Sequence, residues 1–305
     1  MRYVELEFEA ELEGRRSFLP RFPGATLRGA LGYVLRDTVC QLRQADCRHC
    51  VLQAACPYPA IFEGLAPENR RVMRLYERIP QPFVLVVAWP DQHGMASSVL
   101  TWGVRLFGPA CSYWPYVVHV YRTVGQRGLG KRRIRYRLRK VTDAVTGQVV
   151  WSPDNAEPRQ PGFGNVLAGG RSTPDECTLR WVFSTPVRLA LNSGHLSGLD
   201  LVLAGRRRLH IMEYFYGEGD EQGDSESGER LEAGQFTTLA SRIRPWRLQR
   251  YSGRQNRPMS LYGLAGEIVI HGPWGRSGPW LGAVPLLHLG KATSFGLGRA
   301  RWEVV

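Results

Sequence analysis

Residues 288–305 read HLGKATSFGLGRARWEVV, and this glycine-rich stretch bears most directly on the fold. Glycine has no side chain, so backbone N–H groups in such a stretch can approach a phosphate closely. The order G-x-x-x-x-G-K-[ST] of a Walker loop is absent, and the stretch leads into a predicted strand. A plain turn before that strand is therefore the alternative interpretation. The residues that could contact a phosphate are Gly290, Lys291, Thr293, Ser294, Gly296 and Gly298.

The first half of the chain shows patterns of alternating strands and helices. Apolar and polar residues alternate over 2–13, as in a half-buried strand, whereas apolar residues recur at helical spacing over 25–42. The predicted order is strand 2–13, helix 25–42, strands 83–89 and 99–107, helix 109–124 and strand 131–142. This β-α-β-β-α-β order predicts a ferredoxin-like domain over residues 1–151.

The second half follows residues 152–177, which are rich in Pro, Gly, Asp and Asn and predict an inter-domain linker. Over 178–305 we predict strands 178–191 and 199–211, helix 235–250, strand 261–271, a helical turn at 279–287 and strand 299–304. The acidic residues 217–232 predict a mobile loop. The predicted fold class is α+β, with two tandem ferredoxin-like domains and a cysteine-rich metal knot inserted after the first helix.

The charge balance of the 305 residues indicates a polyanionic partner. Forty basic residues face 27 acidic ones, for a net charge of +13, and only three of the basic residues are lysines. A GC-rich genome also explains the arginine bias, but guanidinium groups bind phosphate in either case. No apolar run approaches the roughly 18 residues of a membrane span, and the N-terminus lacks a signal-peptide core, so we expect a cytoplasmic protein without membrane partners.

Residues 131–140, KRRIRYRLRK, predict a strand with one guanidinium face and one apolar face. Such a row of charges suits a nucleic-acid backbone, because no carboxylate lies nearby in the sequence. A solvated surface is the alternative. The candidate RNA-binding residues are Lys131, Arg132, Arg133, Arg135, Arg137 and Arg139, together with Arg254 further along the chain.

Four cysteines within residues 40–56 follow a C-x6-C-x2-C-x5-C pattern. Four thiolates at this spacing suit a tetrahedral zinc site that closes a polar loop, and the expected ligands are Cys40, Cys47, Cys50 and Cys56. An iron–sulfur cluster uses the same ligands, and His49 could replace one of them. Unligated cysteines are the remaining alternative. Cys111 and Cys177 are predicted to be core residues.

Together these stretches resemble the CRISPR repeat-RNA processing endoribonucleases of the RAMP superfamily. The similar blocks are LRGALGYVLRD, CPYPAIFE, LFGPACSYWPYVVHVYRTVGQRGLGKRR, RYSGRQNRPMSLYGLAGEIVIHG and, most specifically, HLGKATSFGLGRA. The resemblance implies two ferredoxin-like domains that hold CRISPR repeat RNA. It also implies metal-independent cleavage of pre-crRNA to crRNA, in which the 2′-hydroxyl attacks the adjacent phosphate and leaves a 2′,3′-cyclic phosphate. Subunits of a CRISPR effector complex are further candidate partners.

One feature departs from the family pattern, because no histidine lies within 25–42, where related enzymes often carry one. His288 is therefore the expected base or acid, with Lys291 stabilising the charged phosphate and Arg28 and Tyr33 in supporting roles. A non-catalytic RAMP subunit that binds guide RNA is the main alternative function. A zinc-knot RNA-binding protein outside CRISPR systems is the second.

Overall fold

The computed structural model describes residues 1–14, 19–20, 22–43, 46–88, 97–155, 157–168, 173–191, 195–218, 231–252 and 257–305. The chain divides into an N-terminal unit, Arg2–Gly164, and a C-terminal unit, Asn165–Val305, with Met1 in the second. The division falls inside the stretch 152–177 that is predicted as a linker. Most of the predicted acidic loop, residues 219–230, lies outside the described residues.

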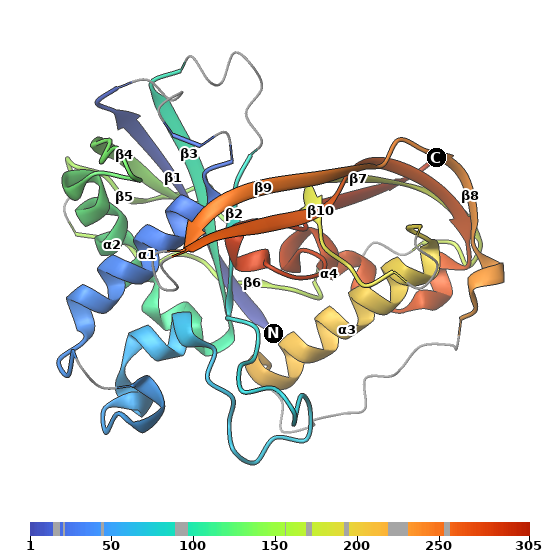
Figure 1. Cartoon of the computed structure of the whole chain (residues 1–305), viewed down its shortest axis with the longest axis horizontal. Helices are drawn as coiled ribbons and strands as arrows, with labels where there is room; N and C mark the ends of the chain where they lie inside the picture. Colours follow the sequence, from blue (N-terminus) through green and yellow to red (C-terminus); the bar gives the residue numbers. More distant parts are fainter. Residues whose placement is uncertain are drawn as a thin grey trace. The chain divides into compact units, whose positions relative to one another are not determined.

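The N-terminal unit contains a mainly antiparallel sheet and two long helices (Figure 1). Its sheet has the order β2-β3-β1-β4-β5. The first four of these strands and the two helices follow one another as β-α-β-β-α-β, consistent with a ferredoxin-like unit. The elements are β1 (Arg2–Leu12), α1 (Gly24–Val39), β2 (Phe83–Val86), β3 (Val99–Phe107), α2 (Trp114–Arg127), β4 (Tyr136–Asp143), β5 (Val149–Trp151) and the two-residue β6 (Gly164–Asn165).

The core of this unit lies between the sheet and the two helices. Alternate residues of β1 are buried, and the Phe8 ring stacks on Trp102 with centroids 5.1 Å apart. Tyr121 of α2 and Leu27 of α1 complete this core, and each is fully buried. Burying a large apolar side chain contributes about 1.5–3 kcal/mol, so this alternation is what fixes the sheet register.

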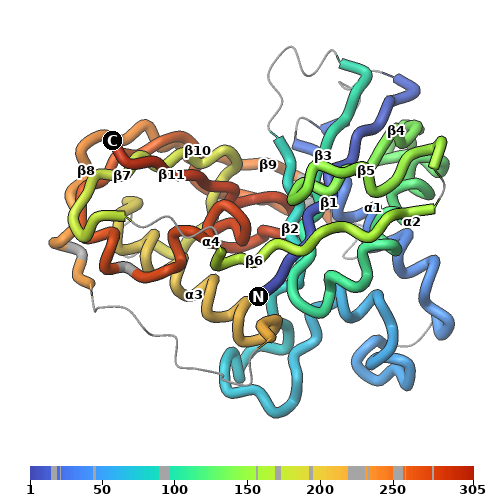
Figure 2. Tube along the Cα trace, turned by 180° about the vertical axis from the view of Figure 1, so that it is seen from behind, coloured from blue at the N-terminus to red at the C-terminus, as the bar shows by residue number. Residues whose placement is uncertain are grey.

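The C-terminal unit contains a second antiparallel sheet, in which β11 lies beside β7 (Figure 2). The order is β11-β7-β10, and both β8 and β9 pair with β10. Its core holds Trp181, Trp274 and Trp280, with Trp181 stacked on Trp280 at 5.9 Å. The elements are β7 (Cys177–Val187), α3 (Gly198–Tyr216), β8 (Thr237–Ser241), β9 (Arg244–Ser252), β10 (Arg257–Gly272), α4 (Trp280–Leu287) and β11 (Ala300–Val304).

Two predicted elements of this unit are wrong. The predicted strand 199–211 is the helix α3, which begins with a capping box in which Ser197 Oγ accepts from Asp200 N at 3.2 Å and Ser197 N donates to Asp200 Oδ2 at 3.0 Å. The predicted helix 235–250 is instead β8 and β9, which pair along β10. In the first case a local capping box starts the helix, and in the second the pairing with β10 overrides the local pattern.

The predicted strand 131–142 starts later than expected. Residues 130–133 form a turn, in which Arg133 has a left-handed φ of 49° and its N–H donates to the Gly130 carbonyl at 3.0 Å. The strand β4 therefore begins at Tyr136. Among the described residues, no helix is both long and apolar enough to cross a membrane.

Candidate functional site

The glycine-rich loop, residues 288–298, connects α4 to β11 and is held by backbone hydrogen bonds to the end of β7. Lys291 N donates to the Arg188 carbonyl at 3.0 Å, and Gly298 N donates to the Pro186 carbonyl at 2.9 Å. Inside the loop, Leu289 N donates to the Gly298 carbonyl at 2.8 Å. The loop is therefore a closed structure whose two ends are tied to each other and to the sheet.

Left-handed backbone conformations shape this loop. Gly290, Gly296 and Gly298 have φ values of 76°, 84° and 77°. A Cβ on Gly298 would also collide with the Leu289 carbonyl oxygen, so only glycine fits there. His288 and Ala292 take positive φ values of 57° and 64° without being glycine. Strain of this kind persists only where surrounding contacts hold it, and it is concentrated at functional sites.

A buried arginine on α3 supports the loop from beneath. Arg208 donates from Nε and Nη2 to the Leu287 carbonyl, each at 3.2 Å, and from Nη2 to Thr293 Oγ1 at 3.0 Å. Desolvation by burial lowers the pKa of Arg208 to about 10, so the guanidinium stays charged at neutral pH. The sequence analysis did not single out this residue, because it placed 199–211 in a strand.

The accessible part of the loop carries positive charge. The Lys291 side chain is exposed, and the Arg188 residue that holds its backbone lies against Tyr262 of β10. The Arg188 guanidinium carbon is 4.1 Å from the Tyr262 ring centroid, and its Nη2 donates to the Tyr262 hydroxyl at 2.6 Å. The Lys291 ammonium, the Arg188 guanidinium and the half-exposed Tyr262 phenol therefore belong to neighbouring backbone segments. Such groups together suit a phosphate with an adjacent base.

The other predicted residues of the loop face inward. His288 is fully buried, and its Nδ1 lies 3.2 Å from the Leu297 carbonyl oxygen. Ser294 is 5% exposed, and Gly296 and Gly298 are also buried, whereas Gly290 is partly exposed. In this conformation the imidazole is out of reach of an RNA. Its role as base or acid stays a prediction that would require the loop to open, and its visible contact is one that positions the loop.

The two predicted residues of α1 differ in accessibility. Tyr33 is 71% exposed, so its hydroxyl is available to a ligand. Arg28 is partly buried, with its guanidinium carbon 4.4 Å from the centroid of the Phe62 ring. Tyr33 is therefore the more accessible of the two supporting candidates.

Along the basic strand, the structure both supports and limits the expected guanidinium face. Arg135, Arg137 and Arg139 are exposed while Tyr136 and Leu138 are buried. However, the absence of carboxylates in the local sequence is misleading, because β1 lies alongside. Arg139 pairs with Glu11 at 2.8 Å and Lys140 with Glu9 at 3.3 Å. Lys131, Arg132 and Arg133 are exposed in the turn before β4, and Arg254 lies outside the described residues.

The four predicted metal ligands surround one hollow of about 340 Å³. Each cysteine is partly buried, and burial raises the pKa of the Cys47 thiol. Over the described part of the chain, which omits residues 44–45 of this segment, no three His, Cys, Asp or Glu side chains are placed to hold a metal ion. The zinc or iron–sulfur site stays a prediction. Cys111 and Cys177 are buried, which confirms them as core residues.

A second cationic surface was missed by the sequence analysis, because it lies where a helix was expected. The antiparallel ribbon of β9 and β10 exposes Arg244 and Arg247, and Tyr262 lies directly opposite Arg247. The alternation of arginine with Trp246 and Leu248 is the signal that could have indicated a strand. Arg247 donates from Nη2 to Ser260 Oγ at 3.1 Å on the same face.

A family model and several solved structures match this chain, whereas no curated protein sequence does. The family model described as the AF_1859_N N-terminal domain matches residues 1–162. A product complex of Thermus thermophilus Cas6 has a TM-score of 0.57 at 14% identity, over 99% of this chain and 100% of that one. A product complex of a second Cas6 protein has a TM-score of 0.51 at 18% identity, with the same coverage.

A partial Cas6-RT-Cas1–Cas2 complex has a TM-score of 0.52 at 12% identity, over 100% of this chain and 46% of that one. These identities are low, so the likeness concerns the fold. Since its family model covers more than half of the residues and the structural similarity spans nearly all of them, the chain belongs to the AF_1859_N family and has a Cas6-like fold.

Proposed function

We propose that the protein is a metal-independent endoribonuclease that binds CRISPR repeat RNA and cleaves pre-crRNA to crRNA. The observation that carries the proposal is the glycine-rich loop, which presents the exposed Lys291 beside the Arg188–Tyr262 pair. The net charge of +13 and the fold shared with Cas6 product complexes support the same ligand. Arg188, Tyr262 and Lys291 all belong to the C-terminal unit, which holds them on neighbouring backbone.

The reaction is an in-line displacement within the RNA. The 2′-hydroxyl loses its proton to a base and its oxygen forms a bond to the adjacent phosphorus. The bond from phosphorus to the 5′-oxygen breaks, and an acid protonates that leaving oxygen, giving a 2′,3′-cyclic phosphate and a 5′-hydroxyl. Lys291 would stabilise the charge on the phosphorane, since its ammonium is exposed at the loop. His288 would act mainly by holding the loop. The supporting role expected of the exposed Tyr33, on the N-terminal unit, stays a prediction.

The test is cleavage of the repeat RNA of the protein's own locus in excess EDTA, alongside a substrate with 2′-deoxyribose at the scissile nucleotide. We expect cleavage of the native RNA and none of the deoxy substrate. Lys291→Ala should slow single-turnover cleavage by at least about 100-fold, a typical effect of removing one transition-state contact. Lys140→Ala is the matched control, because Lys140 is an exposed lysine paired with Glu9.

A second candidate function is RNA binding without cleavage, as a guide-RNA subunit. The burial of His288 favours it, since the histidine of the glycine-rich loop cannot reach a substrate in this conformation. Tight, salt-sensitive binding of native repeat RNA with no cleavage would establish this alternative and refute the proposed endoribonuclease. Full activity of Lys291→Ala would show that the protein cleaves RNA without Lys291, and the role assigned to this residue would be wrong.

A further inference from the structure

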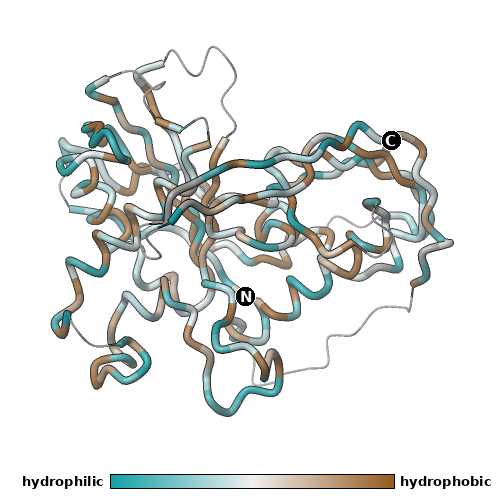
Figure 3. The backbone as a smooth tube through the Cα atoms, viewed as in Figure 1, coloured by the Kyte–Doolittle hydropathy of each residue, from teal (hydrophilic) through white to brown (hydrophobic). Residues whose placement is uncertain are grey.

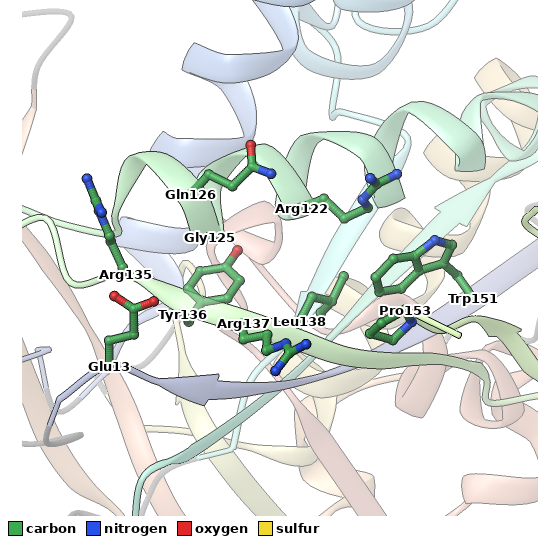
Figure 4. A pocket seen from close by; sticks show the side chains of 10 residues that line it. All are labelled: Glu13, Arg122, Gly125, Gln126, Arg135, Tyr136, Arg137, Leu138, Trp151 and Pro153. Carbon is green, nitrogen blue, oxygen red and sulfur yellow. The ribbon is translucent and has the colours of Figure 1, made fainter. Parts of the chain in front are cut away.

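A pocket of about 590 Å³ lies in the N-terminal unit, apart from the glycine-rich loop. Figure 4 shows Arg122 and Gln126 on the helix α2, Arg137 on the strand β4 and Arg135 just before that strand. Trp151 and Pro153 line one end, and Glu13 lies near Arg135 at the other. The lining residues are Glu13, Arg122, Gly125, Gln126, Arg135, Tyr136, Arg137, Leu138, Trp151 and Pro153.

The pocket follows an edge of β4 that the short strand β5 leaves open. Within the described part of the chain, β5 pairs with β4 only at Val141 and Thr142. One wall is rigid, because the Tyr136 hydroxyl donates to the Tyr121 carbonyl at 2.6 Å inside the core. A ligand at this edge would meet a preformed surface.

The charge of the pocket is strongly positive. Arg122, Arg135 and Arg137 are exposed, and none of them lies within ion-pair distance of a described carboxylate. By contrast, Arg139 and Lys140 just beyond the pocket are neutralised by glutamates of β1. Figure 3 shows hydrophilic residues, drawn in teal, in this part of the unit. Glu13 is the one carboxylate among the lining residues, so an anion would sit toward Arg122 and Arg137.

A guanidinium lies over an aromatic ring at this end of the pocket. The Arg122 guanidinium carbon lies 5.2 Å from the centroid of the Trp151 ring, which is 6% exposed. A guanidinium plane held on an aromatic ring offers its outer face to a nucleobase. The Gln126 amide and the Glu13 carboxylate, both exposed, supply a donor and acceptors for base edges.

We propose that this pocket binds one nucleotide of a single-stranded segment of the RNA, with its phosphate held by the arginines that line the pocket and its base against the Arg122 guanidinium. The inference rests on the proposed function, since it assigns a place on the N-terminal unit to the RNA that the enzyme would process. The pocket would then set where the strand lies before it is cleaved.

The test measures binding and cross-linking of the repeat RNA by the full chain. Arg122→Ala and Arg137→Ala should each weaken binding about tenfold at 0.1 M salt and reduce the slope of log K against log salt by about 1. Arg122→Lys should keep the salt slope and still bind more weakly, because the ammonium cannot stack as a plane. Arg74→Ala is the control, since Arg74 is an exposed arginine of the same unit outside the pocket.

Repeat RNA carrying 4-thiouridine at successive positions locates the bound nucleotide. We expect a cross-link at one single-stranded position to residues 122–126 or 135–153, lost in Arg122→Ala. If the RNA is bound and cleaved while both alanine variants behave like Arg74→Ala, the pocket assignment is wrong and the proposed function stands. If the pocket variants lose binding but no RNA is cleaved, the pocket stands and the endoribonuclease does not.

Free nucleotides form the second arm of the test. AMP, CMP, GMP and UMP should compete with the RNA only at millimolar concentrations, because each supplies one phosphate and one base of a longer ligand. Micromolar binding of a free mononucleotide, with no effect of the pocket variants on RNA, would assign the pocket to a small molecule and overturn the proposal. Absence of any repeat-RNA binding would overturn both the pocket and the proposed function.

Discussion

Replacing the buried Arg208 by methionine should loosen the glycine-rich loop with only a moderate loss of global stability. Methionine has a similar length and no charge, so it removes the three hydrogen bonds to Leu287 and Thr293 without opening a large cavity. The two acceptors then lose their partner in a site where Arg208 itself is only 8% exposed. Leaving a buried polar group unsatisfied costs about 1–3 kcal/mol.

A second contribution to the free energy of unfolding favours the methionine variant. The fall in the pKa of Arg208 from its ordinary value to about 10 corresponds to roughly 3 kcal/mol of unfavourable desolvation, which the methionine variant no longer carries. Two unsatisfied acceptors and this relief nearly offset each other, so we expect the free energy of unfolding to fall by about 1–2 kcal/mol. A much larger loss would show that the buried charge is itself a main source of stability.

The assay combines denaturant unfolding with hydrogen exchange. Trp181, Trp274 and Trp280 lie together in the core of the C-terminal unit and contribute to the fluorescence change on unfolding. The amides of Leu289, Lys291 and Gly298, which bond within the loop or to β7, should exchange at least about tenfold faster in Arg208→Met. The rate of RNA cleavage should fall by a larger factor than the loss in the free energy of unfolding would explain, because Lys291 is then no longer held in place.

The reasoning has two direct refutations. Unchanged protection of these three amides in Arg208→Met would show that the loop does not depend on Arg208. Thr293→Val, which removes one of the acceptors, supplies a double-mutant cycle with Arg208→Met, and a coupling energy near zero would show that their 3.0 Å contact contributes nothing. Arg208 is charged in both the folded and the unfolded protein below pH 10, so its ionisation should leave the free energy of unfolding constant between pH 6 and 9. As pH rises from about 10, the folded state loses the buried charge first, and the free energy of unfolding should increase.

Three further predictions concern other parts of the chain. An alanine in the left-handed conformation costs roughly 1–2 kcal/mol. Gly298→Ala should lower the free energy of unfolding by well over this amount, because its Cβ also meets the Leu289 carbonyl. Gly147→Ala, at φ 76° in open space, should show only the smaller loss in the same denaturant assay. Protein purified without added metal should contain about one zinc per chain, or iron if a cluster forms, and Cys47→Ser should lose it by elemental analysis, whereas clearly sub-stoichiometric metal in the wild type would contradict the site. Arg139→Ala should change the free energy of unfolding by less than about 1 kcal/mol, because Arg139 and Glu11 form an exposed ion pair. It should also weaken RNA binding less than Arg137→Ala does. Equal effects of the two variants on RNA affinity would contradict this reasoning.

The N-terminal half was the more predictable part of the fold. The strand β1 buries alternate residues, as the sequence pattern indicated. The family resemblance was carried by blocks along the whole chain, and the Cas6-like fold confirms it. In the second half, the leucines at 199, 201 and 203 suggest a strand, yet the Ser197–Asp200 capping box starts a helix there. That box was a readable local signal, because it places a hydroxyl and a carboxylate three residues apart.

The site was less predictable, because residue type indicates chemistry but not exposure. His288 was chosen as the histidine beside Lys291, and the structure places it in the core with a strained backbone. Arg208 was unremarkable in the sequence, yet it binds both ends of the segment that carries Lys291. Long-range contacts of this kind, between α3 and the loop, have no signature within a short window of sequence.

Pairing across the sheet decides which of the many arginines are available to RNA. In the register of β1 against β4, Glu9 lies opposite Lys140 and Glu11 opposite Arg137, and their carboxylates pair with Lys140 and Arg139, so two of the seven basic residues of 131–140 are neutralised. Arg135 and Arg137 escape this pairing and join Arg122 from α2 around one pocket. A count of local charges gives the same weight to all of these residues. The ion pairs across the sheet separate them, and they are the reason why the RNA contacts proposed for the N-terminal unit are concentrated at the open edge of β4.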